Sequence, residues 1–286
     1  MPPSADLTAE EIIKRRMADF ARREAHELGR VLITAAIPVK GPFGVLFFGD
    51  PHLDDDGTDL RALRRDMDLV LTHGALWAAN AGDTLNNWTA KLGNLWGQQS
   101  TTAKEAWTLA NWFVGGLAGK WLWIVGGNHD AWSGAGDPLQ WIAAQAGAPY
   151  EMAEIRVGLQ CPNGKLITVN AHHAFNGNSM WNPAHAVMRE AQKGKRDDLI
   201  VGAHTHTSGF GILKDPDTGK MITCLQLASY KVYDRYAREK GLADHHLSPS
   251  ALVIFDPDAK TIAGLVQVFL DTEKGAAYLD FLRSKM

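Results

Sequence analysis

The sequence predicts an α/β fold in which a mixed sheet is covered by helices. Short apolar runs alternate with amphipathic segments through the first half of the chain, an order that produces parallel strands. Near the C-terminus, two apolar runs flank the turn sequence Asp256-Pro257-Asp258, which indicates an antiparallel hairpin. With 286 residues and a hydrophobic content of 45%, the chain can bury a full core. It contains no repeat and no Pro/Gly/Ser-rich linker, which favours one main domain.

The N-terminal segment predicts a separate helix. Thr8 and Glu11 have the spacing of a capping box. The apolar residues that follow recur on one helical face, at Ile12, Ile13, Met17 and Phe20. Basic residues on the other face could contact DNA or a partner, although such a face is more often simply solvated. We therefore expect a helical extension over residues 1–30 and a main domain over residues 31–286.

The strands of the main domain are predicted from short apolar runs bounded by turn residues. These runs are Val31–Ile37, Val45–Phe48, Leu76–Ala81, Trp121–Val125, Leu166–Asn170, Leu199–Gly202, Met221–Leu227, Ala251–Phe255 and Ile262–Phe269.

The helices of the main domain are predicted from helical periodicity. They are Asp59–His73, Thr102–Leu117, Pro138–Gln145, Pro183–Lys193 and Glu273–Arg283. Thr272 is the expected cap of the last one. Tyr230, Tyr233 and Tyr236 recur every third residue, which favours a common helical face.

Composition limits the compartment and the partners. The two cysteines cannot form a disulfide framework, and the polar N-terminus lacks the apolar core of a signal peptide. No run approaches the roughly 18 apolar residues of a membrane span. We expect a cytoplasmic protein. The net charge of -3 argues against a broad basic surface for nucleic acid, but it does not exclude a nucleotide substrate.

Polar side chains follow several of the predicted strands. The motifs are GDPH (Asp50, His52), GDTLNN (Asp83), GGNHD (Asn128, His129, Asp130), NAHH (His172, His173) and GAHTH (His204, His206). Because residues i and i+2 of a strand point to the same face, Asp50 and His52 can reach one point together, and so can His204 and His206. The ends of strands in α/β sheets form the crevice where ligands bind.

The residue types in these motifs indicate a metal site. Imidazole, carboxylate and amide donors suit manganese, iron or zinc, and the absence of thiolate from the set excludes a structural zinc finger. Two carboxylates facing two divalent cations leave a net charge of about +2, which makes a pocket for an anion. Two ions roughly 3.5–4 Å apart would clamp a phosphate and generate an attacking hydroxide.

In this order, the motifs resemble those of the calcineurin-like metallophosphoesterase superfamily, whose pattern is D-x-H, G-D-x-x-D/N, G-N-H-D/E, H and G-H-x-H. The tracts HHAFNGNSMWNPAH and LASYKVYDRYA further resemble metallophosphoesterases of bacteriophages and prophages. The resemblance runs from about Gly41 to the C-terminus. It implies two mixed sheets packed as a sandwich and flanked by helices, in four layers α/β/β/α, and a hydrolase with two divalent ions, manganese favoured over iron or zinc.

The resemblance also implies roles for individual residues. Those expected to hold the first ion are Asp50, His52 and His206, and those expected to hold the second are Asn128, one of His172 and His173, and His204, with Asp83 bridging both ions. Similar phage proteins favour His173 over His172. His129 would act as general acid or electrostatic stabiliser at the leaving oxygen, with Asp130 orienting its ring. Two motifs need comment. An alanine separates Gly202 from His204, which departs from G-H-x-H, and the residue three positions after Asp83 is Asn86, where the family can carry a second carboxylate.

The substrate is predicted less directly than the reaction. Few Lys or Arg residues stand near the motifs, which favours phosphodiesters, including nucleotide-derived ones, over dianionic monoesters. Trp88, Trp132 and Trp181 lie near metal motifs, where an indole could stack on a nucleobase, although core packing is the alternative. Three other functions stay open: a phosphomonoesterase, a DNA or RNA nuclease of the same superfamily, and a non-catalytic, metal-stabilised interaction module.

Overall fold

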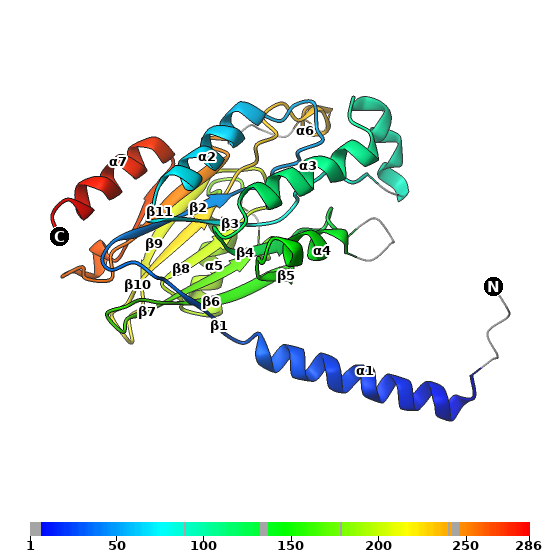
Figure 1. Cartoon of the computed structure of the whole chain (residues 1–286), viewed down its shortest axis with the longest axis horizontal. Coiled ribbons are helices and arrows are strands. Elements are labelled where there is room, and N and C mark those ends of the chain that lie inside the picture. The colour runs from blue at the N-terminus through cyan, green and yellow to red at the C-terminus, as the bar shows by residue number, and fades with distance from the viewer. Residues whose placement is uncertain (1–6, 89, 132–136, 178, 240, 242–245) are drawn as a thin grey trace.

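The computed structural model describes the chain except for residues 1–6, 89, 132–136, 178, 240 and 242–245. Two six-stranded mixed sheets pack face to face, and helices cover both outer faces (Figure 1). This arrangement confirms the predicted four-layer sandwich.

The first sheet has the strand order β12-β11-β2-β3-β4-β5. Its strands are β2 (Phe43–Phe48), β3 (Leu76–Asn80), β4 (Trp121–Gly126), β5 (Tyr150–Met152), β11 (Ser250–Phe255) and β12 (Val266–Phe269). Strands β2 to β5 run parallel, and β11 pairs antiparallel with both β2 and β12. The parallel region and the C-terminal hairpin are therefore confirmed. The loops that follow β2, β3 and β4 all leave from one edge of the sheet.

The second sheet has the order β1-β6-β7-β8-β10-β9. Its strands are β1 (Ile33–Ala36), β6 (Glu154–Gln160), β7 (Leu166–His172), β8 (Leu199–Gly202), β9 (Gly209–Lys214) and β10 (Met221–Gln226). Strands β7, β8 and β10 run parallel, so the loops after β7 and β8 also leave from one edge.

Helices on the outer faces complete the domain. The first sheet is covered by α2 (Leu60–Thr72), α3 (Ala103–Gly116), α4 (Pro138–Gln145) and α7 (Thr272–Arg283), and the second by α5 (His185–Lys193) (Figure 1). Shorter helices are η1 (Ala90–Gln98), α6 (Arg235–Glu239) and η2 (Ile262–Gly264). The main apolar core lies between the two sheets and continues between the first sheet and its helices, and a smaller one lies between α5 and the second sheet.

The N-terminal helix α1 (Ala9–Gly29) projects away from the sandwich (Figure 1). Its capping box between Thr8 and Glu11 is formed as predicted, and none of its residues is buried. Contacts near its C-terminal end attach it to the domain, including one between His26 Nε2 and Glu151 Oε2 at 3.1 Å. The boundary at residue 30 stays a prediction.

Several predicted elements need correction. Strands β5, β6 and β9 were not predicted, and the segment Ile262–Phe269 is a short helix followed by a strand. Helix α7 begins one residue earlier than expected, because the carboxylate of Asp271, not the hydroxyl of Thr272, caps it by accepting the amide of Lys274. None of the helices in the described part of the chain is both long and apolar enough to cross a membrane.

The tyrosine repeat does not form a helical face. Tyr230 lies in the loop after β10, where its buried hydroxyl donates to Asp66 of α2 at 2.6 Å. Tyr233 is exposed, and both residues precede α6. The side chain of Tyr236 lies outside the described part of the chain. Tyr230 thus holds the loop against α2 and fixes the start of the segment that leads to α6.

Both cysteine thiols should be inert in the native protein. Burial raises the pKa of Cys224 to about 12 and also raises that of Cys161. At pH 8, the Cys224 thiol is therefore thiolate in only about one molecule in 10⁴, whereas an unperturbed thiol is substantially ionised. We expect no reaction with a chromogenic disulfide reagent at pH 8 before denaturation and two equivalents after it. A full equivalent reacting within minutes in the native protein would contradict this burial.

Candidate metal centre

Two groups of side chains that could hold a metal ion lie where the loops of both sheets meet. The first consists of Asp50 and His52, from the loop after β2, and His206, from the loop after β8. The Nε2 atoms of the two histidines are 3.1 Å apart, and that of His206 lies 3.4 Å from Asp50 Oδ2.

The second group consists of Asp83 after β3, His173 directly after β7, and His204 after β8. His173 Nε2 lies 3.2 Å from Asp83 Oδ2 and 3.2 Å from His204 Nδ1. The side-chain oxygen of Asn128, from the loop after β4, is 3.0 Å from the same nitrogen.

Asp83 belongs to the second group but also lies near the first. Its Oδ2 atom is 3.2 Å from His173 Nε2 in the second group and 4.0 Å from His52 Nε2 in the first. The structure therefore brings together all seven residues that the sequence nominated as metal ligands. Five separate loops, drawn from both sheets, supply them.

The two adjacent histidines after β7 have different surroundings. His173 is buried in the cluster, with Nδ1 2.9 Å from the carbonyl oxygen of Ala81. That contact leaves Nε2 facing Asp83 and Asn128. His172 instead packs edge-on against Phe175 at a ring separation of 4.9 Å. The geometry thus places His173, and not His172, beside the other donors.

The backbone of the cluster has an unusual conformation. Among the described residues other than glycine, only seven have positive φ, and five of them are Asp50, His52, Asp83, His204 and His206. Each such residue costs of order 1–3 kcal/mol and persists only where the surrounding structure enforces it. Conformational strain is therefore concentrated on the nominated ligands, a pattern that is typical of functional sites.

Two glycines allow the loops to approach this closely. Gly82 has φ +115°, and a side chain there would collide with the ring of His173. A side chain at Gly127 would collide with the carboxylate of Asp83. The glycines in GDTLNN and GGNHD are therefore required by the close packing of the donors.

The donor atoms fit a cation. The Oδ1 atom of Asp50 and the Nδ1 atom of His52 are buried and have no hydrogen-bond partner within the described residues. Burial raises the pKa of Asp50 to about 7, so its ionised form needs a nearby positive charge. Burial also lowers the pKa values of His52 and His204, which keeps their rings neutral and their lone pairs available. Buried carboxylate and neutral imidazole together form a donor set for divalent transition metals.

His129 lies beside the cluster, with Nε2 3.8 Å from Asp83 Oδ2. Its Nδ1 atom lies 2.5 Å from the carbonyl oxygen of Asn86, so a backbone group orients the ring. The expectation that Asp130 orients this ring stays a prediction. The Asp130 carboxylate accepts the amides of Thr84 and Gly127, which joins the loops after β3 and β4.

The three tryptophans nominated for substrate binding differ in setting. Trp88 is 8% exposed and packs edge-on against His129, and its Nε1 donates to Gln99, so little of its ring is open to a ligand. Trp181 is 88% exposed in the segment before α5. Trp132 lies outside the described residues.

Two residues near the cluster were missed by the sequence reasoning. Lys231 is buried, and Asp234 lies behind His206. Both belong to the tract LASYKVYDRYA. Its repeated tyrosines suggested a packed helix. The lysine and aspartate between them are charged residues in a largely apolar and aromatic tract, and this could have indicated a functional role.

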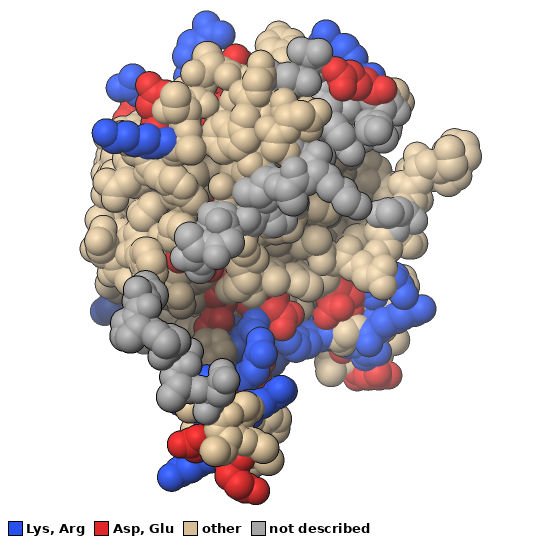
Figure 2. Space-filling view, turned by 90° about the vertical axis from the view of Figure 1, so that its right-hand side faces the viewer, with Lys and Arg blue, Asp and Glu red and all other residues tan. Residues whose placement is uncertain are grey.

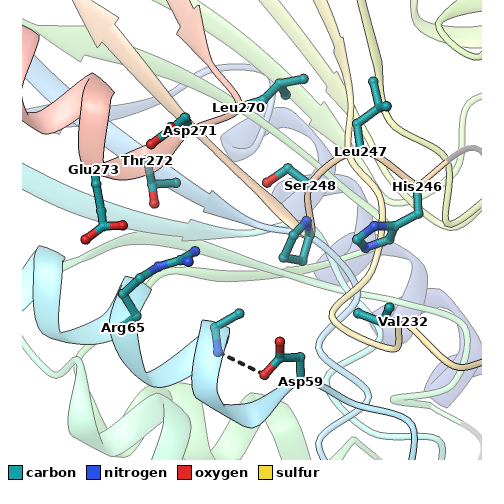
Figure 3. Close-up of a pocket in the computed structure, with 12 residues that line it drawn as sticks. Asp59, Arg65, Val232, His246, Leu247, Ser248, Leu270, Asp271, Thr272 and Glu273 are labelled. Carbon is teal, nitrogen blue, oxygen red and sulfur yellow. Dashed lines mark hydrogen bonds between the residues drawn. The ribbon is translucent and has the colours of Figure 1, made fainter.

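A cavity of about 510 Å³ lies apart from the donors, between the start of α2, the start of α7 and the segment before β11. Asp59, which caps α2, and Arg65 of α2 stand on one side of it, and Thr272 and Glu273 of α7 on another (Figure 3). None of the seven donors lines it. Because its lining carries both acidic and basic groups, the cavity favours neither anionic nor cationic ligands.

Comparison with models of known protein families finds no match, and no curated protein matches the sequence. Solved structures do match, at low identity. The NAD nucleotidase of Haemophilus influenzae is 12% identical over 80% of this chain, with a TM-score of 0.39, and 49% of its own length is covered. This chain therefore spans about half of that protein.

Two further solved structures are covered over most of their own length. The nuclease MPE of Pseudomonas putida is 12% identical over 79% of this chain and 87% of its own, with a TM-score of 0.38. The calcineurin-like phosphoesterase YfkN of Bacillus subtilis is 11% identical over 85% of this chain and 99% of its own, with a TM-score of 0.39.

Proposed function

We propose that this protein is a metal-dependent phosphoesterase with a dinuclear site, and that it hydrolyses phosphodiesters, including nucleotide-derived ones. One observation supports the proposal above all others. Seven oxygen and nitrogen donors from five loops, the carboxylate of Asp83 among them, lie together, and five of the donor residues have strained backbones. A purely structural polar cluster needs neither the strain nor a buried Asp50 oxygen that has no hydrogen-bond partner in the described part of the chain.

The donors divide between two ions. Asp50, His52 and His206 would hold the first, and Asn128, His173 and His204 the second, with Asp83 shared. Oxygen and imidazole donors suit manganese, iron or zinc, and the resemblance of the motifs to those of calcineurin-like metallophosphoesterases favours manganese. When bound, a pair of divalent ions supplies Lewis-acid activation of a phosphoryl group and of the water that attacks it.

His129 supplies a proton-transfer group at the edge of this site. With Nδ1 held at the Asn86 carbonyl, the ring exchanges its proton at Nε2, which lies on the side of Asp83. The leaving oxygen of a phosphoester needs a proton as its bond to phosphorus breaks. A positioned histidine contributes about 10²–10⁴-fold to such a step.

The surroundings of the site favour a substrate with a single negative charge. Lys231, the buried lysine behind His206, is paired with two carboxylates, so its charge is not available to grip a second phosphate oxygen. On the face shown in Figure 2, Lys and Arg form separate groups with acidic and uncharged residues between them. A nuclease that follows a nucleic-acid backbone is expected to show a continuous basic strip.

The test is a hydrolysis panel with metal-free and manganese-loaded protein. We expect loaded protein to hydrolyse an aryl phosphodiester faster than the matching monoester, and chelation to abolish turnover. Cyclic nucleotides and single-stranded oligonucleotides form the remaining arms, and salt-dependent cleavage of oligonucleotides would favour the nuclease instead. Loaded protein that binds two ions yet turns over none of these substrates would favour the non-catalytic module.

Replacing Gly82 with alanine should displace the second ion. The new methyl group would collide with His173, and the positive φ adds strain of about 1–3 kcal/mol. We expect the affinity for the second manganese ion to fall at least about 10-fold, because the ring that must hold it can no longer keep its place. Manganese content after dialysis and isothermal titration measure this.

Gly119→Ala is the matched control for this substitution. Gly119 also has positive φ, at +79°, but nothing lies within 4 Å of the added methyl group. Gly119→Ala should lose stability from the backbone strain alone and still bind two ions. If both variants bind manganese as the wild type does, the close approach of Gly82 to His173 has no role in metal binding.

A further inference from the structure

Lys231 is an unusual residue for its position. Its side chain is 4% exposed, and its Nζ atom lies 3.0 Å from Asp55 Oδ2 and 3.3 Å from Asp234 Oδ1. Lysine is almost never buried unless it is paired, because its charge must be compensated when water is removed. A group with so little exposure does not touch substrate, so its role must be exerted through its neighbours.

Those neighbours are the loops that carry the metal donors. Asp55 belongs to the loop of His52, and its amide donates to the carbonyl oxygen of that histidine at 3.0 Å. The other contact of Asp55 Oδ2 is with the side-chain amide of Asn86, in the loop of Asp83, at 2.8 Å. Lys231 Nζ also lies 5.3 Å from the ring centre of Trp88, the residue that packs against His129.

Asp234 connects Lys231 to the third loop. Its Oδ1 atom accepts the amide of Ala237 at 3.1 Å and lies near Lys231 Nζ. Its Oδ2 atom faces Nδ1 of His206 at 3.6 Å. One carboxylate oxygen is thus held by the helix start and the lysine, while the other faces the histidine.

The orientation of His206 makes this contact important. Its Nε2 atom points into the donor cluster, toward Asp50 and His52. A ring that binds a metal through Nε2 must carry its proton on Nδ1, and a carboxylate facing Nδ1 selects that tautomer. For His173 a backbone carbonyl lies at the equivalent position, whereas for His206 the side chain of Asp234 does.

We propose that Asp234 is a positioning residue for the first metal ion and that Lys231 stabilises the loops that support it. Asp234 fixes the tautomer and orientation of His206, and Lys231 holds Asp234 while it joins the loops of His52 and Asp83. The inference rests on the proposed function, since it assigns His206 to a metal. The two residues control different properties, because Asp234 acts on metal affinity and Lys231 acts on the stability of the support.

The test compares manganese binding in Asp234→Ala, Asp234→Asn and Lys231→Met by isothermal titration and by metal content after dialysis. We expect Asp234→Ala to weaken binding of one of the two ions by about 10–100-fold, the usual effect of removing such a partner. Asp234→Asn keeps an acceptor oxygen and should lose less. Lys231→Met should stay within about 3-fold of the wild-type affinity and unfold at a lower temperature, because it leaves two partly buried carboxylates without their cationic partner.

Asp215→Asn is the matched control. Asp215 is also a buried carboxylate paired with a basic side chain, Arg196, but it lies in the turn between β9 and β10, at the far end of β10 from the donors. Losing it should lower the unfolding temperature and leave both manganese affinities unchanged. Circular dichroism confirms that each variant is folded.

The outcomes separate this inference from the function on which it rests. A wild-type protein that binds neither manganese, iron nor zinc overturns both. If the wild type binds two ions and Asp234→Ala binds both equally tightly, this inference alone is overturned. It is also overturned if Lys231→Met and Asp215→Asn weaken metal binding as much as Asp234→Ala does, because the effect would then be general loosening of the fold.

Discussion

Asp83→Asn is expected to lower kcat for an aryl phosphodiester by at least about 10³-fold, which corresponds to roughly 4 kcal/mol of lost transition-state stabilisation. The carboxylate of Asp83 is buried between the two donor groups, so it is the one side chain that both ions would share. Asparagine has almost the same shape but removes the negative charge. We therefore expect the manganese content to fall from two ions per chain to one or none.

The same variant should lose its stabilisation by manganese. An ion at 100 times its Kd adds about 2.7 kcal/mol to the free energy of unfolding of a protein that holds it. The unfolding temperature of wild type should therefore rise with manganese, and that of Asp83→Asn should rise less. Asp197→Asn, which removes a buried carboxylate paired with Arg156 near the start of β8, should keep full turnover. Equal turnover of wild type and Asp83→Asn would contradict the proposed mechanism.

His129→Ala has the second largest expected effect, a fall in kcat of about 10²–10⁴-fold with both manganese ions still bound. The ring lies beside Asp83 but outside the seven donors, and the carbonyl of Asn86 holds its orientation. Loss of proton transfer should therefore appear as a defect in turnover without a defect in metal content. Steady-state kinetics and metal analysis on the same preparation measure both quantities.

The leaving group distinguishes the role of His129. If the ring donates a proton to the leaving oxygen, the loss should be larger for a phenyl ester than for a p-nitrophenyl ester, whose leaving group departs readily as the anion. His73→Ala is the control, because His73 forms a surface contact with Asp280 and should leave turnover unchanged. Loss of bound manganese in His129→Ala would show instead that the ring acts as a ligand.

Most elements of the fold could be predicted because their residues have a single consistent pattern. Strand β2 is apolar throughout and fully buried, and α4 begins with a proline behind an aspartate cap. Strand β6 was missed because glutamate, arginine and two polar or small residues interrupt its apolar pattern. Strand β9 was missed because it contains two glycines in six residues and lies at the sheet edge, where tertiary pairing with β10 decides its conformation.

The donor set could be nominated from the sequence because each donor stands just after an apolar strand. The backbone conformation of the donor loops could not be predicted. The positive φ of His204 and His206 arises from loops that pack against one another, and no local pattern encodes it. The same holds for the groups that orient the rings. The backbone carbonyl of Asn86 reaches His129, and Asp234 reaches His206, through contacts between distant parts of the chain.

The most direct test of the central claim is an anomalous-scattering experiment on crystals soaked with manganese. We predict two peaks roughly 3.5–4 Å apart, one beside His52 and His206 and the other beside His173 and His204, with the carboxylate of Asp83 between them. A single peak, or none among these side chains, would contradict the dinuclear site and the reaction assigned to it.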